Sequence, residues 1–273
     1  TEIRSACWQQ GLQPPTRRTV QRRLDAMDAL EIAKAREGVK AARQKFAPVV
    51  GDNKANRPLE VVQIDHTPAD IIIVDSFERQ PIGRPWVTLA IDVATRMVTG
   101  YYTSLEAPSR LSVALCLTQA VAPKAELLAK LACNSPWPAQ GKPQSIHVDN
   151  GRDFRSRAFR SACAEWGIDL IYRPPGSPHF GGHIERLIGT MMGAVHLLPG
   201  TTQSSVAAKG DYDAEGHATM TLSEFDHWFA LEICRYNNSI HSSIGCTPVA
   251  KWEALSEQMT GDIPFEMEAF RVS

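Results

Sequence analysis

The pattern of apolar and polar residues predicts a series of short β-strands that begins near residue 59. The segments 59–67, 69–76, 85–95 and 97–104 are rich in β-branched residues, and the first of them alternates between apolar and polar side chains. Only a few residues separate each segment from the next. Strands with such short connections favour antiparallel pairing. This part of the chain is therefore expected to form an antiparallel meander.

Helices and strands alternate along the following part of the chain. Helical periodicity is present at 109–122 and 155–167, a short buried strand is predicted at 144–151, and another short strand is predicted at 168–174. A third helix follows, with one apolar stripe formed by Ile184, Leu187, Ile188, Met191 and Val195. Three strands followed by helix, strand, helix, strand and helix describe an α/β fold with a sheet of mixed direction.

The first 45 residues are predicted to be helical and basic. A helix over 2–10 is followed by a break at 11–15, and Thr16 is a candidate N-cap for a second helix over about 17–30. A stripe of Val20, Leu24 and Met27 is expected to pack. Four arginines lie near the start of this second helix: Arg17, Arg18, Arg22 and Arg23. The pattern is typical of a DNA-binding helix-turn-helix, although a solvated amphipathic helix explains it equally well.

The net charge of −1 hides an uneven distribution. Residues 1–58 contain 12 Lys and Arg but only 6 Asp and Glu, which leaves 17 basic and 24 acidic residues in the rest of the chain. A basic segment joined to an acidic body suggests a polyanion-binding element attached to a domain that holds cations. The six cysteines form no C-x-x-C pair, which argues against a zinc ribbon or a disulfide framework and favours a reduced, cytosolic compartment.

The sequence also bears on membrane insertion and export. It contains no run of 18 apolar residues, so no membrane span or membrane partner is expected. No signal-peptide pattern follows the first residue. Because the sequence starts with Thr1 rather than with Met, we expect it to be an excised piece of a longer protein.

Three carboxylates lie where predicted elements begin or end. Asp65 lies in the first strand, Asp149 ends a later strand just before Asn150 and Gly151, and Glu185 starts a helix after a loop rich in Gly and Pro. Functional groups of open α/β sheets gather where strands end and loops begin. A buried carboxylate is costly unless it is paired or binds a cation. Oxygen ligands with few His or Cys favour Mg²⁺ or Mn²⁺ over zinc.

Taken one at a time, these acids fit capping, turn or ion-pair roles better than metal binding. Asp92 also lies in a strand and competes with Asp65 for the first position. The spacing makes the set more specific, because 35 residues separate Asp149 from Glu185. This resembles the D–D–E signature of the retroviral-integrase and transposase superfamily, as do the surrounding motifs. These are QIDHT, IDVATRMVTGYY, HVDNGRDF, PPGSPHFGGHIERLIGTM and RYNNSIHSSIGCTPVAKW, which together span about residues 58–253.

The resemblance, which is strongest to the TniA/TnsB and phage Mu group, implies a fold and a domain plan. It implies an RNase H-like mixed five-stranded sheet flanked by helices, preceded by a basic helix-turn-helix-like segment. The expected parts are a partial DNA-binding segment (1–46), a linker (47–58), a catalytic core (59–255) with a flexible insertion (199–221), and the start of a C-terminal region (256–273). The His/Cys zinc module that precedes the core in retroviral integrases is absent from this sequence.

The resemblance also implies chemistry and partners. Asp65, Asp149 and Glu185 are expected to hold two Mg²⁺ ions, with Mn²⁺ as a substitute, for 3′-end cleavage at transposon ends and strand transfer into target DNA. DNA contacts are expected from Arg17, Arg18, Arg22, Arg23, Arg173, His183 and Arg186, and His147 and Asn150 are expected to support the acids. The expected partners are double-stranded DNA, further copies of the chain assembled on it, and an AAA+ ATPase that selects the target, in the bacterial cytoplasm at the nucleoid.

Two other functions compete with this one. A metal-dependent nuclease of the same fold would hydrolyse DNA but never join it. A non-catalytic DNA-binding regulator would keep the acids for structural reasons, although the complete acid triad argues against that alternative.

Overall fold

A computed structural model describes residues 2–39, 42, 55–151, 154–174, 178–203 and 211–257. The chain divides into an N-terminal helical unit within residues 1–52 and an α/β unit from residue 53 onward. The predicted linker therefore lies largely outside the described residues, as does nearly all of the predicted C-terminal region. No helix in the described ranges is long and apolar enough to cross a membrane.

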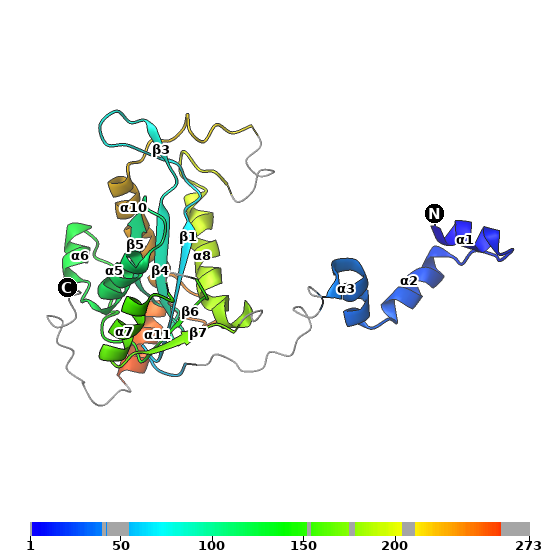
Figure 1. The fold of residues 1–273 in the computed structure, drawn as a ribbon, viewed down its shortest axis with the longest axis horizontal. Coiled ribbons are helices and arrows are strands. Elements are labelled where there is room, and N and C mark those ends of the chain that lie inside the picture. Colours follow the sequence, from blue (N-terminus) through cyan, green and yellow to red (C-terminus); the bar gives the residue numbers. More distant parts are fainter. Residues whose placement is uncertain are drawn as a thin grey trace. The chain divides into compact units, whose positions relative to one another are not determined.

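The N-terminal unit contains α1 (Glu2–Gln9), α2 (Arg17–Asp25) and α3 (Ala29–Glu37), drawn in blue in Figure 1. Thr16 is confirmed as an N-cap, because its side chain accepts a hydrogen bond from the Thr19 N–H at 3.2 Å. The predicted continuation of the second helix to residue 30 is wrong. The Asp28 side chain accepts from the Leu30 N–H at 2.7 Å and so begins a separate helix.

The predicted packing stripe of α2 is not buried in this structure. Val20 and Leu24 are half-buried, and Met27, just beyond the helix, is 52% exposed. The four arginines are all exposed: Arg17, Arg18, Arg22 and Arg23. An exposed basic helix is compatible with both alternatives from the sequence, and the helix-turn-helix interpretation stays a prediction.

The α/β unit is built on a five-stranded sheet of order β5-β4-β1-β6-β7. β1 pairs antiparallel with β4, which pairs antiparallel with β5, whereas β1, β6 and β7 run parallel. The strand bounds are β1 (Val61–Pro68), β4 (Trp86–Asp92), β5 (Val98–Ser104), β6 (Ser145–Val148) and β7 (Asp169–Tyr172). The expected RNase H-like arrangement, a mixed five-stranded sheet flanked by helices, is confirmed.

Helices cover both faces of this sheet (Figure 1). One hydrophobic core joins the sheet to α5 and α7, and the other joins it to α8, α10 and α11. The helix bounds are α5 (Arg110–Val121), α6 (Ala125–Lys130), α7 (Arg157–Glu165), α8 (Gly182–Val195), α10 (Leu222–Asn237) and α11 (Pro248–Ser256). Along β1, Val62 and Ile64 enter the first core, so the alternate residues Gln63 and Asp65 face α8.

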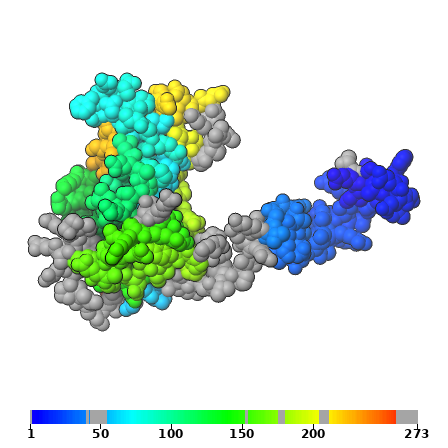
Figure 2. All heavy atoms as spheres, viewed as in Figure 1, coloured from blue at the N-terminus to red at the C-terminus, as the bar shows by residue number. Residues whose placement is uncertain are grey.

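A small second sheet pairs β2 (Ile73–Val74) with β3 (Pro81–Gly83). The predicted strand at 69–76 is thus reduced to two residues and an isolated bridge between Ile71 and Thr201. The Ile72 N–H donates to the Gly200 carbonyl at 2.8 Å, which ties the start of the predicted insertion to this hairpin. Figure 2 shows the two segments in contact at the surface, in cyan and yellow. Residues 204–210 of the insertion lie outside the described residues.

Asp92 closes the turn between β4 and β5. Its fully buried carboxylate accepts hydrogen bonds from the Leu59 and Thr95 N–H groups, both at 2.8 Å, and from Thr95 Oγ1 at 2.6 Å. In the β1–β4 register it lies opposite Val62, three residues before Asp65. Asp92 is therefore engaged in a structural turn rather than in the cluster around Asp65.

Burial raises the pKa of Asp92 to about 6, so stability is expected to depend on pH. The folded state holds the proton more tightly than the unfolded state, so this contribution is present below about pH 4 and is lost as pH rises through 6. Relative to Asp92→Asn, the wild type is expected to lose about 2–3 kcal/mol of unfolding free energy between pH 4 and 7. Urea unfolding of both proteins across this range measures it, and a pH-independent difference would contradict it.

Candidate active site

The parallel strands bring three predicted site residues to one end of the sheet. Gln63 of β1 pairs in register with His147 of β6, which pairs with Ile171 of β7. Two residues further along the same strands come Asp65, Asp149 and Arg173. Residues i and i+2 of a strand share a face, so these three side chains form a row across the sheet. The Arg173 N–H donates to the Val148 carbonyl at 2.9 Å and thereby extends the β6–β7 pairing to this row.

Arg173 lies between two of the predicted acids. Its Nη1 is 3.3 Å from Asp65 Oδ2 and 3.7 Å from Glu185 Oε1, and its side chain is 11% exposed. Within the described residues, Arg173 Nε and Nη2 are buried and have no hydrogen-bond partner. Burial raises the pKa of Asp65, Arg173 opposes this increase, and the charge of Asp149 adds to it. Asp65 and Glu185 thus share one positive charge, and Asp149 is near enough to Asp65 to raise its pKa.

The turn after β6 fixes Asp149 by close backbone contacts. Asp149 Oδ1 accepts from the Gly151 N–H at 2.8 Å, and a Cβ at Gly151 would lie 2.8 Å from the same oxygen. Asn150 Nδ2 donates to the Arg173 carbonyl at 2.7 Å, and Asn150 Oδ1 accepts from Arg155 Nη2 at 2.6 Å. The exposed Asn150 therefore joins the end of β6 to the end of β7, next to Arg173.

Glu185 reaches the site from the first turn of α8, and Gln63 holds that turn in place. Gln63 Nε2 donates to the Phe180 carbonyl at 2.7 Å, and its Oε1 accepts from the Ile184 N–H at 3.1 Å. The Gln63 side chain is fully buried. Sequence reasoning missed this residue, although a glutamine inside the apolar run VVQI is a visible signal. Gln63 fixes the start of α8 against β1, where Asp65 lies.

Gly181 leaves room for the Arg173 guanidinium next to the start of α8. A Cβ at this buried glycine would lie 2.4 Å from Arg173 Nη1, 2.6 Å from Arg173 Cζ and 2.8 Å from Glu185 Oε1. Its backbone φ of −104° is accessible to any residue, so the need for glycine comes from space rather than from conformation. Gly181 belongs to the short 3₁₀ turn Pro178–Gly181 that precedes α8.

Three other predicted site residues belong to the same unit as this row: His147, His183 and Arg186. His147 is buried beneath the row, and burial together with the charge of Arg173 lowers its pKa. Burial, Arg96, Arg186 and His241 lower the pKa of His183 to about 4, so its imidazole is neutral at pH 7. Arg186 is exposed, one residue after Glu185 on α8. The four arginines near the start of α2 belong to the other unit.

The carboxylates suit a divalent cation in kind. Asp65, Asp149 and Glu185 offer hard oxygen ligands, the type that Mg²⁺ and Mn²⁺ prefer. Asp65 and Glu185 already lie near one cation, the Arg173 guanidinium. Within the described ranges, no three His, Cys, Asp or Glu side chains are close enough together to hold an ion as they stand. The three carboxylates are therefore of the chemical type that binds Mg²⁺ or Mn²⁺. The Arg173 guanidinium lies next to two of them, Asp65 and Glu185.

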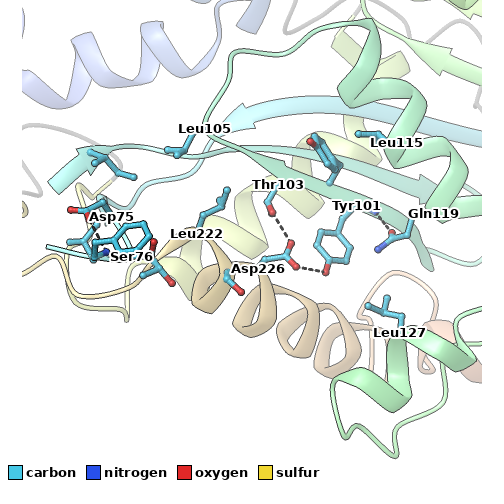
Figure 3. A pocket seen from close by; sticks show the side chains of 16 residues that line it. Asp75, Ser76, Tyr101, Thr103, Leu105, Leu115, Gln119, Leu127, Leu222 and Asp226 are labelled. Atoms are coloured by element: carbon cyan, nitrogen blue, oxygen red, sulfur yellow. Dashed lines mark hydrogen bonds between the residues drawn. The ribbon is translucent and has the colours of Figure 1, made fainter. Parts of the chain in front are cut away.

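A separate cavity of about 860 Å³ opens beside β5, α5 and α10 (Figure 3). Its walls are largely apolar, and none of the predicted site residues lines it. Asp226 accepts hydrogen bonds from Thr103 Oγ1 at 2.6 Å and from the Tyr101 hydroxyl at 3.4 Å. Burial raises the pKa of Tyr101, so its hydroxyl stays protonated and donates. These polar groups satisfy one another within the wall of the cavity.

Comparison with known proteins finds similarity to transposases. The chain is 29% identical over 254 residues to the transposase for transposon Tn552 of Staphylococcus aureus, which covers 93% of this chain and 49% of that protein. It is 27% identical over 229 residues to the Tn7 transposition protein TnsB of Escherichia coli, which covers 77% of this chain and 32% of that protein. The chain thus spans about half or less of the length of these relatives.

Among solved structures, the chain resembles a chain of the simian T-cell lymphotropic virus intasome, determined in complex with the PP2A regulatory subunit B56 gamma. The TM-score is 0.50 at 15% sequence identity, over 80% of this chain and 60% of that one. At this identity the likeness shows the fold alone. The family described as the TnsB C-terminal domain matches residues 63–200, a range that contains Asp65, Asp149, Arg173 and Glu185. The chain belongs to the TnsB C-terminal domain family.

Proposed function

We propose that this chain is the catalytic region of a DNA transposase that cleaves the 3′ ends of a transposon and joins them to target DNA. The observation that carries the proposal is the row of Asp65, Asp149 and Arg173 on parallel strands, with Glu185 held beside it by α8. The similarity to the Tn552 transposase and to TnsB supports the same reaction class. This support comes from relatives that are much longer than this chain.

In the proposed reaction, Asp65 and Asp149 would hold divalent cations from adjacent strands, and Glu185 would complete the ligand set from α8. Two Mg²⁺ ions, for which Mn²⁺ can substitute, supply activation of the attacking oxygen and stabilisation of the leaving oxygen when bound. Water first hydrolyses one phosphodiester at the transposon end, which frees a 3′-hydroxyl. That hydroxyl then displaces the 3′-oxygen of a target phosphodiester, so one phosphodiester is exchanged for another without a covalent protein intermediate.

The DNA contacts and partners follow from the same proposal. The exposed arginines Arg17, Arg18, Arg22 and Arg23 offer phosphate contacts from α2, and Arg186 offers one beside the acids. His183, neutral at pH 7, is suited to donate a hydrogen bond rather than to supply charge. Because two transposon ends must be joined, we propose a homo-multimer assembled on double-stranded DNA, with an AAA+ ATPase to select the target. Such a protein works in the bacterial cytoplasm, at the nucleoid.

A strand-transfer assay tests this function directly. The purified full-length protein is incubated in Mg²⁺ with a labelled, pre-cleaved transposon end that carries a free 3′-hydroxyl, together with target plasmid. The proposal predicts covalent joining of the label to the plasmid. Metal-dependent nicking without joining would instead indicate the nuclease alternative. DNA binding with neither nicking nor joining would indicate the regulator.

A further inference from the structure

Arg173 lies between Asp65 and Glu185, two of the three acids that are proposed to bind cations. Its Nη1 lies 3.3 Å from Asp65 and 3.7 Å from Glu185, and Asp149 acts on the same carboxylate, Asp65, from the neighbouring strand. An arginine side chain that is only 11% exposed has lost most of its hydration, and the surrounding carboxylates offset that cost. The guanidinium therefore balances the charge of the acids in the chain described here.

The guanidinium makes one hydrogen bond in the site, from Nη1 to Asp65 Oδ2 at 3.3 Å. An arginine has five N–H donors, but Nε and Nη2 of Arg173 have no partner within the described residues. The backbone of Arg173, in contrast, is fixed at both polar groups, because its N–H donates to Val148 and its carbonyl accepts from Asn150. These backbone hydrogen bonds do not depend on the position of the guanidinium.

A divalent cation and the guanidinium cannot share this position. Two positive charges a few ångströms apart repel each other strongly where water is largely excluded. We propose that Arg173 is a displaceable internal counter-ion, which occupies the cation position until divalent metal binds and is then released toward the DNA phosphates. This inference rests on the proposed metal-dependent function, and it gives Arg173 two successive partners, first the acids and then the DNA.

Direct measurement of Mn²⁺ binding without DNA tests the proposal. Isothermal titration of the full-length protein is expected to give a Kd for Mn²⁺ that is lower by about tenfold in Arg173→Gln than in the wild type, because the competing charge is gone. Without metal, Arg173→Gln is expected to melt at a lower temperature, and Mn²⁺ is expected to raise that temperature more than in the wild type.

Arg160→Gln is the matched control. It removes the same charge from an exposed arginine of α7, and it is expected to leave the Kd within about twofold. Mn²⁺ binding that depends on Asp149 but is not tightened by Arg173→Gln would overturn the role of Arg173 and leave the metal site standing. Absence of Mn²⁺ binding in every variant would overturn both proposals.

Discussion

Asp149→Asn is expected to lower the rate of strand transfer by about two to four orders of magnitude. Asparagine keeps the size of the side chain and an oxygen that can accept the Gly151 N–H, so the turn after β6 is preserved. What it loses is the negative charge that would bind metal. Loss of a metal ligand removes several kcal/mol of transition-state stabilisation, and each 1.4 kcal/mol corresponds to a factor of ten in rate. Single-turnover joining of a pre-cleaved end measures the effect.

Glu185→Gln is expected to produce a loss of the same order, because it removes the ligand contributed by α8. Asp169→Asn provides the matched control, since Asp169 is an exposed aspartate at the start of β7, distant in sequence from the row of acids. That control is expected to join DNA at the wild-type rate. Strand transfer that survives in both Asp149→Asn and Glu185→Gln would rule out the assignment of these residues as metal ligands.

Gln63→Leu is expected to destabilise the α/β unit by about 1–3 kcal/mol. Leucine has a similar volume, so the change tests hydrogen bonding rather than packing. It removes the hydrogen bonds that Gln63 makes with the Phe180 carbonyl and the Ile184 N–H. An unsatisfied buried polar group costs about 1–3 kcal/mol, and the buried Ile184 N–H loses its side-chain acceptor here. Urea unfolding measures the loss of stability.

The same variant is expected to lose strand transfer even at temperatures where it remains folded, because the start of α8 and therefore Glu185 is no longer fixed against β1. Gln144→Leu is the matched control, since Gln144 is an exposed glutamine just before β6. A destabilisation of less than about 0.5 kcal/mol in Gln63→Leu would show that the two hydrogen bonds are dispensable.

Local sequence patterns were sufficient to predict the elements that bury one face against the sheet. The stripe of α8 predicted its buried residues, and Ile184, Leu187, Met191 and Val195 are indeed buried. The patterns failed where an element is short or where one side chain decides its end. The six-residue α6 has no side-chain N-cap, and the break between α2 and α3 depends on Asp28 alone. Neither feature produces a periodic signal.

The candidate site was likewise predictable from the sequence only in part. Spacing and family resemblance indicated the three acids, but neither indicated that Arg173 lies between Asp65 and Glu185. That position depends on the parallel pairing of β6 with β7, which joins residues far apart in the sequence. The role of Gln63 depends likewise on a contact across 121 residues to Ile184. Such contacts follow from the tertiary fold, and no pattern within a short window encodes them.

The register of β1, β6 and β7 has a consequence for how this site tolerates insertions and deletions. Neighbouring strands are spaced at about 4.8 Å, so the distances between Asp65, Asp149 and the end of β7 are set by hydrogen bonding across the sheet. These distances do not depend on the number of residues in the connecting segments. The 35 residues between Asp149 and Glu185 therefore correspond to the length of chain that forms α7 and β7 and leads back to α8. Lengthening the loop before α7 should leave the acids in place, whereas a shift of one residue within β6 would turn Asp149 to the opposite face.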